Sequence, residues 1–459
     1  MTRIQPFQEK YLNPQPEPAD TKVKTAVASA FFILFLVLAA SAFGASVIRE
    51  RNEIGKKLYP QHLILPFAFY NKTFNFAYGI SWGANGFIQD QMRTFMEIMG
   101  SSNSSFNFSL LLMDYKLPFS SRLFLSPIIS IGKYGKMKAY IDGNPGYLHE
   151  RAGTNNSDKD NYMDKKGWDS FADLNIHYVF PIGAGKDSGI HTFILNKGFL
   201  EEEPTGGSTW NPLKSGITTV GMRPFYRHQS IDKIGSGTQH IDTNGLKLYL
   251  EYDNTDFFQN PTKGSYQRFG ISRDWGWFGS SDSWTMLETE LCKYFSLGES
   301  TWFRQQVVAL DFWTAETPSW STRIVNGKEE IRHRAPYFMG PSLGGLYRMR
   351  AYPRYRFNDK AAIYYSVELR FTPKWHPLGE IPWIKRWLKW DYWQLVPFIE
   401  TGRVADAWSV TKLHRKMKLD AGIGLRAYMR KLMIRLDIAF SNEGGGGALW
   451  IGHPFQFQK

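Results

Sequence analysis

The chain has 459 residues, and its 55 Lys and Arg against 42 Asp and Glu give a formal net charge of +13. Aromatic residues make up 16% of it and its mean hydropathy is −0.36. It is therefore too aromatic for a disordered chain and too polar for a helical membrane protein with several spans. The single cysteine, Cys292, excludes an intramolecular disulfide framework and any site built on several cysteines. The basic balance indicates anionic partners, either nucleic acid or a lipid surface.

The first element in chain order is an apolar segment without charges, from Thr25 to Ile48. Lys24 precedes it and the small residues Ala40-Ser41-Ala42 stand near its end. A basic flank, an apolar core and a small-residue site predict a secretory signal peptide. An uncleaved membrane anchor is the alternative, because the apolar run is long enough to span a bilayer. Both readings predict export, with residues 1–44 as leader and residues 45–61 as a short N-terminal segment.

The rest of the chain shows the alternation of strands. Apolar and polar residues alternate over about ten positions at Leu246 to Tyr252, Tyr364 to Phe371, Leu432 to Phe440 and Leu449 to Phe457. A soluble β-sandwich gives the same alternation, but export and the aromatic content favour a membrane barrel. Residues 62–459 are therefore predicted to be all-β, a closed transmembrane barrel of antiparallel strands. At roughly 25 residues per strand and connection, about 16 strands fit.

Long polar stretches are expected to be loops. They run over residues 142–169, 200–243 (with breaks) and 316–334. Outer-membrane barrels have long extracellular loops and short periplasmic turns, so this asymmetry also favours the barrel.

Three segments carry a resemblance to a known family. The first contains Asp253, Asp256, Pro261 and Gly264; the second contains Gly344, Gly345, Arg350, Tyr352 and Glu368; the third contains Glu400 and Gly402, followed by the run Asp420 to Arg426. In this order and spacing they resemble the barrel of the BamA/TamA surface-antigen superfamily of outer-membrane assembly and transport proteins. The resemblance covers about the last 210 residues and implies a barrel with one extracellular loop folded into the lumen.

The resemblance also implies a lumen-loop lock formed by Arg350, Tyr352 and Glu400. In this family an arginine at the loop tip reaches an acidic residue on the inner wall, and an arginine in a narrow lumen needs such a carboxylate. Ala351 stands where the family has glycine, so a turn with positive φ there would be strained. Thr255 stands where the family usually has arginine. Both departures predict a looser or specialised lock.

Two further features belong to the resemblance. Gly452, Phe455 and Phe457 resemble the terminal strand signal of outer-membrane barrels, although an edge strand with alternating aromatics would look the same. Too few residues stand between Ala42 and Leu63 for a polypeptide-transport-associated domain. The resemblance is therefore to a short member that consists of the barrel only.

One segment predicts contact with the membrane surface. Its tryptophans share one face of a short helix and its cations lie between them: Trp383, Trp387 and Trp390, with Lys385, Arg386 and Lys389. Indoles at headgroup depth and cations near lipid phosphates are typical of an interfacial helix. An ordinary aromatic girdle is the alternative.

Catalytic patterns give little support for an enzyme. The run Gly340 to Gly344 matches G-x-S-x-G around Ser342, but a nucleophile elbow needs an α/β sheet. The ten histidines have no ligand spacing, so we predict neither a metal nor a cofactor. Export makes nucleic acid an improbable counterpart for the charge. Lipopolysaccharide and phospholipid, with unfolded outer-membrane proteins as clients, are the predicted partners.

Three hypotheses follow for function. The resemblance implies a bacterial outer-membrane barrel that assists the insertion or transport of outer-membrane proteins or lipids. A passive pore or structural barrel, and a lipid-modifying barrel enzyme with Ser342 as nucleophile, are the alternatives.

Overall fold

The computed structural model describes residues 47–51, 61–71, 74–202, 205, 207, 209–325, 328–379, 381–382, 389–429 and 432–451. The predicted leader, residues 1–44, lies outside the described residues, and of the predicted N-terminal segment 45–61 only residues 47–51 and 61 are described. Several predicted site residues also lie outside the described ranges, namely Trp383, Lys385, Arg386, Trp387, Gly452, Phe455 and Phe457.

Strands dominate the described part of the chain. In its first half they are β1 (Val47–Arg51), β2 (Gln61–Asn71), β3 (Asn75–Asn85), β4 (Arg93–Ser101), β5 (Phe106–Met113), β6 (Tyr115–Lys116), β7 (Leu123–Ala139), β8 (Met163–Val179), β9 (Ile190–Asn196), β10 (Phe199–Leu200) and β11 (Ile217–Asp232). In its second half they are β12 (Thr238–Asp253), β13 (Gly264–Asp274), β14 (Trp284–Gly298), β15 (Phe303–Glu316), β16 (Ser321–Val325), β17 (Lys328–Arg332), β18 (Ser342–Leu343), β19 (Phe357–Asn358), β20 (Ala361–Pro373), β21 (Trp390–Ala405), β22 (Lys418–Met429), β23 (Leu432–Ser441) and β24 (Gly444–Ile451).

Helices are short. They are the 3-10 turns η2 (Pro145–Tyr147) and η3 (Gly183–Gly185) and the helix α3 (Val410–Leu413). No helix in the described ranges has the length and apolar character needed to span a membrane.

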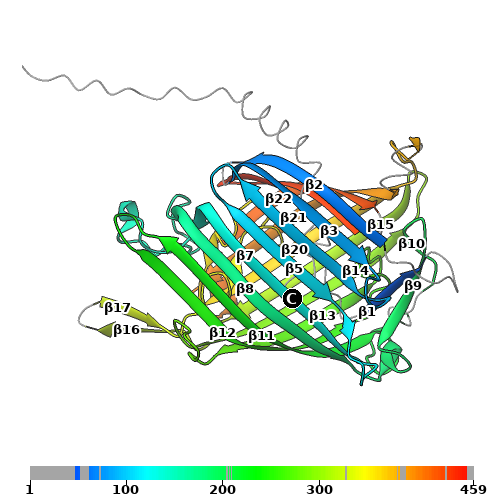
Figure 1. Ribbon diagram of the computed structural model, residues 1–459, viewed down its shortest axis with the longest axis horizontal. Helices are drawn as coiled ribbons and strands as arrows, with labels where there is room; N and C mark the ends of the chain where they lie inside the picture. The colour runs from blue at the N-terminus through cyan, green and yellow to red at the C-terminus, as the bar shows by residue number, and fades with distance from the viewer. Residues whose placement is uncertain are drawn as a thin grey trace, which may run out of the picture.

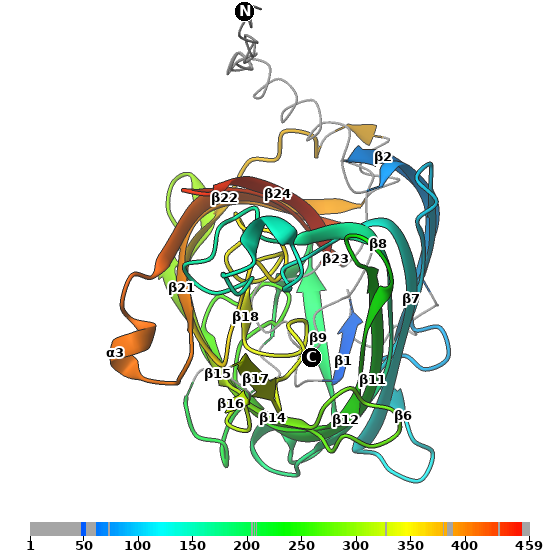
Figure 2. The ribbon, with the colours of Figure 1, turned by 90° about the vertical axis from the view of Figure 1, so that its left-hand side faces the viewer.

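The large sheet is an antiparallel meander that curls round on itself (Figures 1 and 2). From β2 to β24 each strand pairs with the next strand of the sheet, with β8 joined to β11 and β15 joined to β20. β5 and β6 both pair with β7, so they are one strand interrupted at Asp114, which has a φ of 63°. The described strands therefore agree with the predicted number of about 16.

Charged side chains of the large sheet point into its lumen, and apolar side chains point outward. Side chains of every second residue are exposed and apolar on several strands, for example Phe76, Tyr78, Ile80, Leu248, Leu250, Ile423 and Leu425. The residues between them are buried and many are charged, for example Arg268, Glu368, Arg370, Glu400, Arg426 and Arg435. This is the reverse of a water-soluble barrel and is typical of a sheet surrounded by lipid.

The two ends of the sheet differ. The loop end carries the long connections 140–162 and 317–360, and it faces the viewer in Figure 2. At the opposite end, which we call the turn end, most connections are short, for example residues 299–302. Longer connections at the turn end are 374–389, between β20 and β21, and 180–216, which joins β8 to β11 and contains β9 and β10.

A small separate sheet, the luminal sheet, is formed by β1, β9 and β10. β1 pairs with β9 in parallel and β10 pairs with β9 in antiparallel orientation. Its buried aromatic and aliphatic side chains pack against residues of the inner wall, and the cluster consists of Phe193, Leu195, Phe199, Phe257, Phe258, Tyr392, Tyr428 and Met433. Since Tyr392, Tyr428 and Met433 belong to the inward-facing series of β21, β22 and β23, this sheet occupies the lumen at the turn end.

Loop predictions were partly wrong. The stretch 200–243, expected to be a loop, contains all of β11 and the start of β12. These strands look polar because their inward residues include Arg227 and Gln229, which are buried in the lumen. Polar composition thus marked the wall of the lumen as well as the loops.

Candidate functional site: the arginine of the lumen loop

The loop 317–360 places its tip inside the sheet. β18 and β19 pair with each other in this loop, and its residues Leu343, Met349 and Tyr352 pack with the inward-facing Tyr364 and Phe398. The backbone amides of Gly344 and Gly345 donate to the carbonyls of Arg348 and Tyr352, both at 3.0 Å. Both glycines have strongly positive φ, 105° and 117°, which non-glycine residues rarely adopt.

Arg350 lies at this tip and contacts three carboxylates. Its Nε is 3.0 Å from Glu400 Oε1, and its Nη1 is 2.9 Å from Asp437 Oδ2 and 3.1 Å from Glu368 Oε1. The guanidinium also lies 3.4 Å from the ring centre of Phe398. Its side chain and those of Glu368 and Glu400 are almost fully buried, so the arginine without its carboxylate partners would be an uncompensated buried charge, at a cost of about 3–5 kcal/mol.

Glu368 is shared by three arginines. Besides Arg350, it lies 2.9 Å from Arg370 and 2.7 Å from Arg426, and these side chains are also buried. A carboxylate surrounded in this way balances part of the positive charge of the inner wall. The tip arginine is therefore joined to a network that spans β20, β21, β22 and β23.

Main-chain and hydroxyl groups of the tip add further contacts. The amide of Arg350 donates to Glu400 Oε2 at 2.7 Å, and the amide of Ala351 donates to Asp420 Oδ2 at 2.9 Å. The hydroxyl of Tyr352 lies 3.1 Å from the carbonyl of Leu419 and 3.1 Å from Asn442 Oδ1. The structure thus places Arg350, Tyr352 and Glu400, the three residues of the predicted lock, in one contact network.

The expected strain at Ala351 does not occur. Ala351 is absent from the described residues with positive φ, and Met349, two positions earlier, has a φ of 57° instead. Gly402 gives the loop its space, because a Cβ there would lie 2.8 Å from Leu343 Cδ1. The tip therefore approaches the wall closely without a glycine at position 351.

The first group of family-motif residues lies at the turn end, away from Arg350. Asp253 accepts hydrogen bonds from the amide and hydroxyl of Thr255, at 2.9 and 2.7 Å. Asp256 accepts from the amide of Thr262, next to Pro261, at 2.8 Å. Gly264 has a φ of 95°, and a Cβ there would lie 2.3 Å from the carbonyl of Asn254. These residues shape the turn between β12 and β13. Thr255, which stands where the family usually has arginine, donates to the carboxylate of Asp253.

The predicted membrane-surface helix is only partly within the described residues. Trp390 begins strand β21, and its indole nitrogen donates to the carbonyl of Tyr392 at 2.8 Å. Lys389, directly before it, has a φ of 45°. Trp390 therefore does not continue a helical face, because its backbone enters the sheet.

The sequence interpretation missed several members of the Arg350 network. Asp437 was not singled out, and Arg370 and Arg426 belonged to family segments but were given no role, although each stands at an inward position of an alternating strand. It also missed the cover of the loop end: Arg356 donates to the hydroxyl of Ser157 in the loop 140–162 at 3.0 Å and pairs with Glu443 at 2.7 Å. Charged residues at inward positions of the strands were the signal that could have identified these residues. Their partners on other strands could not be assigned, because those contacts depend on register.

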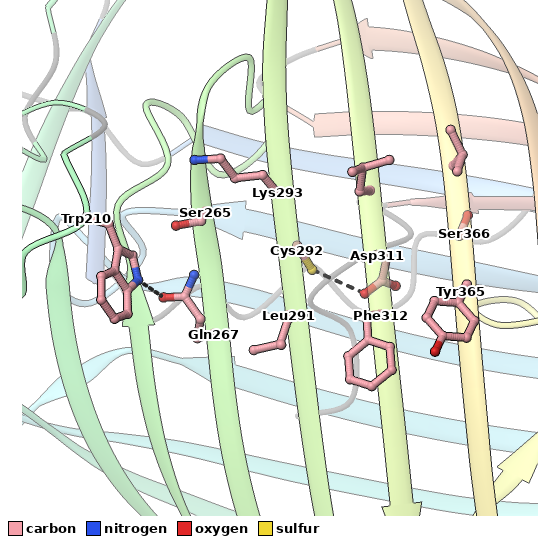
Figure 3. A pocket seen from close by; sticks show the side chains of 12 residues that line it. Trp210, Ser265, Gln267, Leu291, Cys292, Lys293, Asp311, Phe312, Tyr365 and Ser366 are labelled. Atoms are coloured by element: carbon pink, nitrogen blue, oxygen red, sulfur yellow. Dashed lines mark hydrogen bonds between the residues drawn. The ribbon is translucent and has the colours of Figure 1, made fainter. Parts of the chain in front are cut away.

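One group of residues has the donor atoms for a metal ion. The ligand atoms of Glu290, Cys292 and Asp311 lie within 4.8 Å of one another. The thiol of Cys292 donates to Asp311 Oδ1 at 3.4 Å (Figure 3), and Glu290 lies 3.5 Å from Arg348. These polar contacts explain the three side chains as members of the inner wall, with protein groups as their partners. Ser342, the nucleophile candidate, pairs in β18 with Asn358 of β19 and so does not stand at a strand-to-helix elbow.

Comparison with known proteins places the chain in a family. Residues 208–458 match the model of the Omp85 superfamily domain, and no curated protein matches. Among solved structures, BamA from Haemophilus ducreyi lacking POTRA domains 1–3 is 14% identical, with a TM-score of 0.44 over 86% of this chain and 71% of that one. CdiB from Acinetobacter baumannii is 12% identical with a TM-score of 0.46, and CdiB from Escherichia coli is 10% identical with a TM-score of 0.47; each match covers 85% of this chain. This chain spans 59% of the length of either CdiB structure. Because the family match extends over more than half of its residues, the chain belongs to the Omp85 superfamily.

Proposed function

We propose that this chain is a closed barrel of the bacterial outer membrane that assists the insertion or transport of outer-membrane proteins or lipids. It acts by opening between its first and last strands, β2 and β24, which we call the seam. Membership of the Omp85 superfamily and the apolar outer face support this proposal. The loop end then faces the outside of the cell and the turn end faces the periplasm.

The observation that carries the proposal is the position of the Arg350 tip beside the seam. Its partners Glu400, Asp420 and Asp437 stand on β21, β22 and β23. On β24, a Cβ at Gly446 would lie 2.9 Å from the carbonyl oxygen of Arg350. The loop therefore braces the last four strands of the sheet from the inside, and its release would loosen that side of the barrel.

The composition of β24 supports a weak seam. The described part of this strand begins with Gly444-Gly445-Gly446-Gly447. Glycine weakens a strand because it offers no side chain to pack and is costly to order. An edge of this kind separates from its neighbour more easily than the long strands β7 and β8 do.

A permanently open pore fits the lumen poorly. The loop 317–360 fills the loop end, where Arg356 joins it to the loop 140–162. The luminal sheet fills the turn end. Both obstructions support a barrel that opens on demand, and the pairing of Ser342 within β18 gives the lipid-modifying alternative no support.

The experiment is an inventory of outer-membrane proteins and lipids in a strain that lacks the chain. We expect specific outer-membrane components to be depleted, and the wild-type chain to restore them. Arg350→Ala should fail to restore them although it reaches the membrane. Arg332→Ala, which removes an exposed arginine paired with Glu330, is the matched control and should restore them. An unchanged inventory in the deletion strain would contradict the proposal.

A further inference from the structure

A groove crosses the outer face of the sheet over β13, β14, β15 and β20. It has a volume of about 460 Å³. Its lining includes the outward-facing Gln267, Leu291, Lys293, Leu310, Phe312 and Val367 (Figure 3). Trp210, from the connection 180–216, stands at one side of it.

The groove contains a lysine on the face that would meet lipid. Cys292 and Tyr294 are buried on the inner side, so Lys293 between them points outward. Its ammonium lies 5.5 Å from the ring centre of Phe295. Among the described residues, no carboxylate lies within 4.0 Å of it. A lysine on the lipid face costs up to about 2–4 kcal/mol at mid-membrane and much less where it meets an anion near the surface.

The depth of Lys293 matches the headgroup layer at the turn end. It pairs in register with Ser265, the second residue of β13 after the turn 254–263. Trp210 lies in the connection at the same end, and its indole nitrogen donates to Gln267 Oε1 at 3.2 Å. The indole is 68% exposed. A tryptophan and a lysine at the same level are typical of the zone of lipid headgroups.

The rest of the groove is apolar. Leu291, Leu310 and Val367 are each partly exposed along it, and the ring of Phe312 stands beside them (Figure 3). Leu310 pairs in register with Lys293, and Val367 pairs with Leu310, so these side chains flank the lysine. Leu291 and its partner Phe312 lie two residues further from the turn 254–263. An acyl chain that extends from a phosphate at Lys293 toward the middle of the membrane would lie on Leu291 and Phe312.

We infer that this groove binds an anionic glycerophospholipid of the periplasmic leaflet. Its phosphate pairs with Lys293, its glycerol backbone contacts Trp210 and Gln267, and one acyl chain lies on Leu291 and Phe312. The inference rests on the proposed function for the placement of the sheet in the outer membrane. It adds a fixed lipid site on the side of the sheet away from the seam.

The test is native mass spectrometry of the full chain in detergent, with phosphatidylglycerol or phosphatidylcholine added. We expect one phosphatidylglycerol to remain bound after washing that removes phosphatidylcholine. Lys293→Gln should reduce its retention about fivefold, the effect of one cation at a lipid surface, and Trp210→Ala should also reduce it. Lys133→Gln is the matched control, because Lys133 is another exposed lysine beside an aromatic ring, that of Trp168.

Equal retention by Lys293→Gln and wild type, or equal retention of both lipids, would overturn the inference. Retention of the heat-resistant migration of folded barrels in gels shows that each variant is folded. The binding measurement does not involve the seam. If the wild-type chain binds the lipid but does not restore the outer-membrane components of the deletion strain, only the proposed function is refuted. If it restores these components but does not bind the lipid, only the lipid site is refuted.

Discussion

At the scale of single residues, the clearest feature is a buried arginine that shares three carboxylates. In the variant Glu400→Gln, Arg350 keeps the carboxylates of Glu368 and Asp437, but its partner at position 400 no longer carries a charge. We expect a loss of about 1–3 kcal/mol of stability, because the buried hydrogen bonds from Arg350 to position 400 are no longer made to a charged acceptor. The loss should appear as unfolding of the barrel at a lower temperature in gel-shift assays. Glu330→Gln, at an exposed ion pair, should change stability by less than about 1 kcal/mol.

Two neighbouring glycines of β24 allow a sharper test of the contact with the tip. A Cβ at Gly446 would lie 2.9 Å from the carbonyl oxygen of Arg350, whereas a Cβ at Gly447 would have no neighbour nearer than 3.8 Å. Gly446→Ala should therefore destabilise the folded barrel by about 1–3 kcal/mol through overpacking. Gly447→Ala should be neutral or slightly stabilising. Equal unfolding temperatures for the two variants would show that the tip does not press on β24.

The sequence alone gave part of this network. Arg350 and Glu400 could be paired from the family resemblance, and the structure places them 3.0 Å apart. Asp437 and Arg426 could not be assigned as partners, because a contact across strands depends on a register that no local pattern specifies. The relaxed backbone at Ala351 was also unpredictable, since the positive φ moved to Met349.

At the scale of elements, the luminal sheet is the feature that the sequence did not reveal. Its strand β9 has seven residues and no alternation of charge, so nothing in the sequence marked it as part of a separate sheet. The transmembrane strands β12, β20 and β23 were predictable because their alternation is strong. The short pairings of the luminal sheet depend on the inner wall around them.

Removing the anchor of the luminal sheet should open the turn end. Phe193 is 1% exposed and contacts the rings of Phe257 and Phe258. Phe193→Ala should cost about 3–5 kcal/mol of the local packing. We expect faster protease cleavage within 187–202 and higher conductance in planar bilayers. Phe119→Ala, which removes an 80% exposed ring, should change neither.

Acid should loosen the same element. His191 of β9 is buried and its Nε2 lies 3.1 Å from the carbonyl of Ala184. Burial lowers the pKa of His191 below its ordinary value near 6.5, so the folded sheet favours the neutral ring. Below about pH 6.5 the unfolded segment therefore binds more protons than the folded sheet does. The stability that neutral His191 contributes above that pH is lost as the pH falls. Cleavage at pH 5.5 should therefore exceed that at pH 7.5, and His191→Gln should remove the difference. A pH dependence that persists in His191→Gln would assign the effect to other groups.

At the scale of the whole molecule, three features are connected with the proposed seam. The Arg350 tip braces β21 to β24, the glycine-rich β24 forms a weak edge, and β1 of the luminal sheet precedes the seam strand β2 in the chain. The number of strands, their alternation and the family could be predicted from sequence because they are properties of the entire chain. The contact of the tip with Gly446 on β24 could not, because it depends on the register of the last strands.

The measurement that tests the central claim most directly is a disulfide clamp across the seam. Cysteines placed singly along Gln61–Asn71 and Gly444–Ile451, in a Cys292→Ser background, are combined until one pair crosslinks under oxidation. The account predicts that the oxidised chain fails to restore the outer-membrane inventory of the deletion strain, and that a reductant returns its activity. Full restoration by a chain that remains quantitatively crosslinked would contradict the claim that the barrel works by opening between β2 and β24.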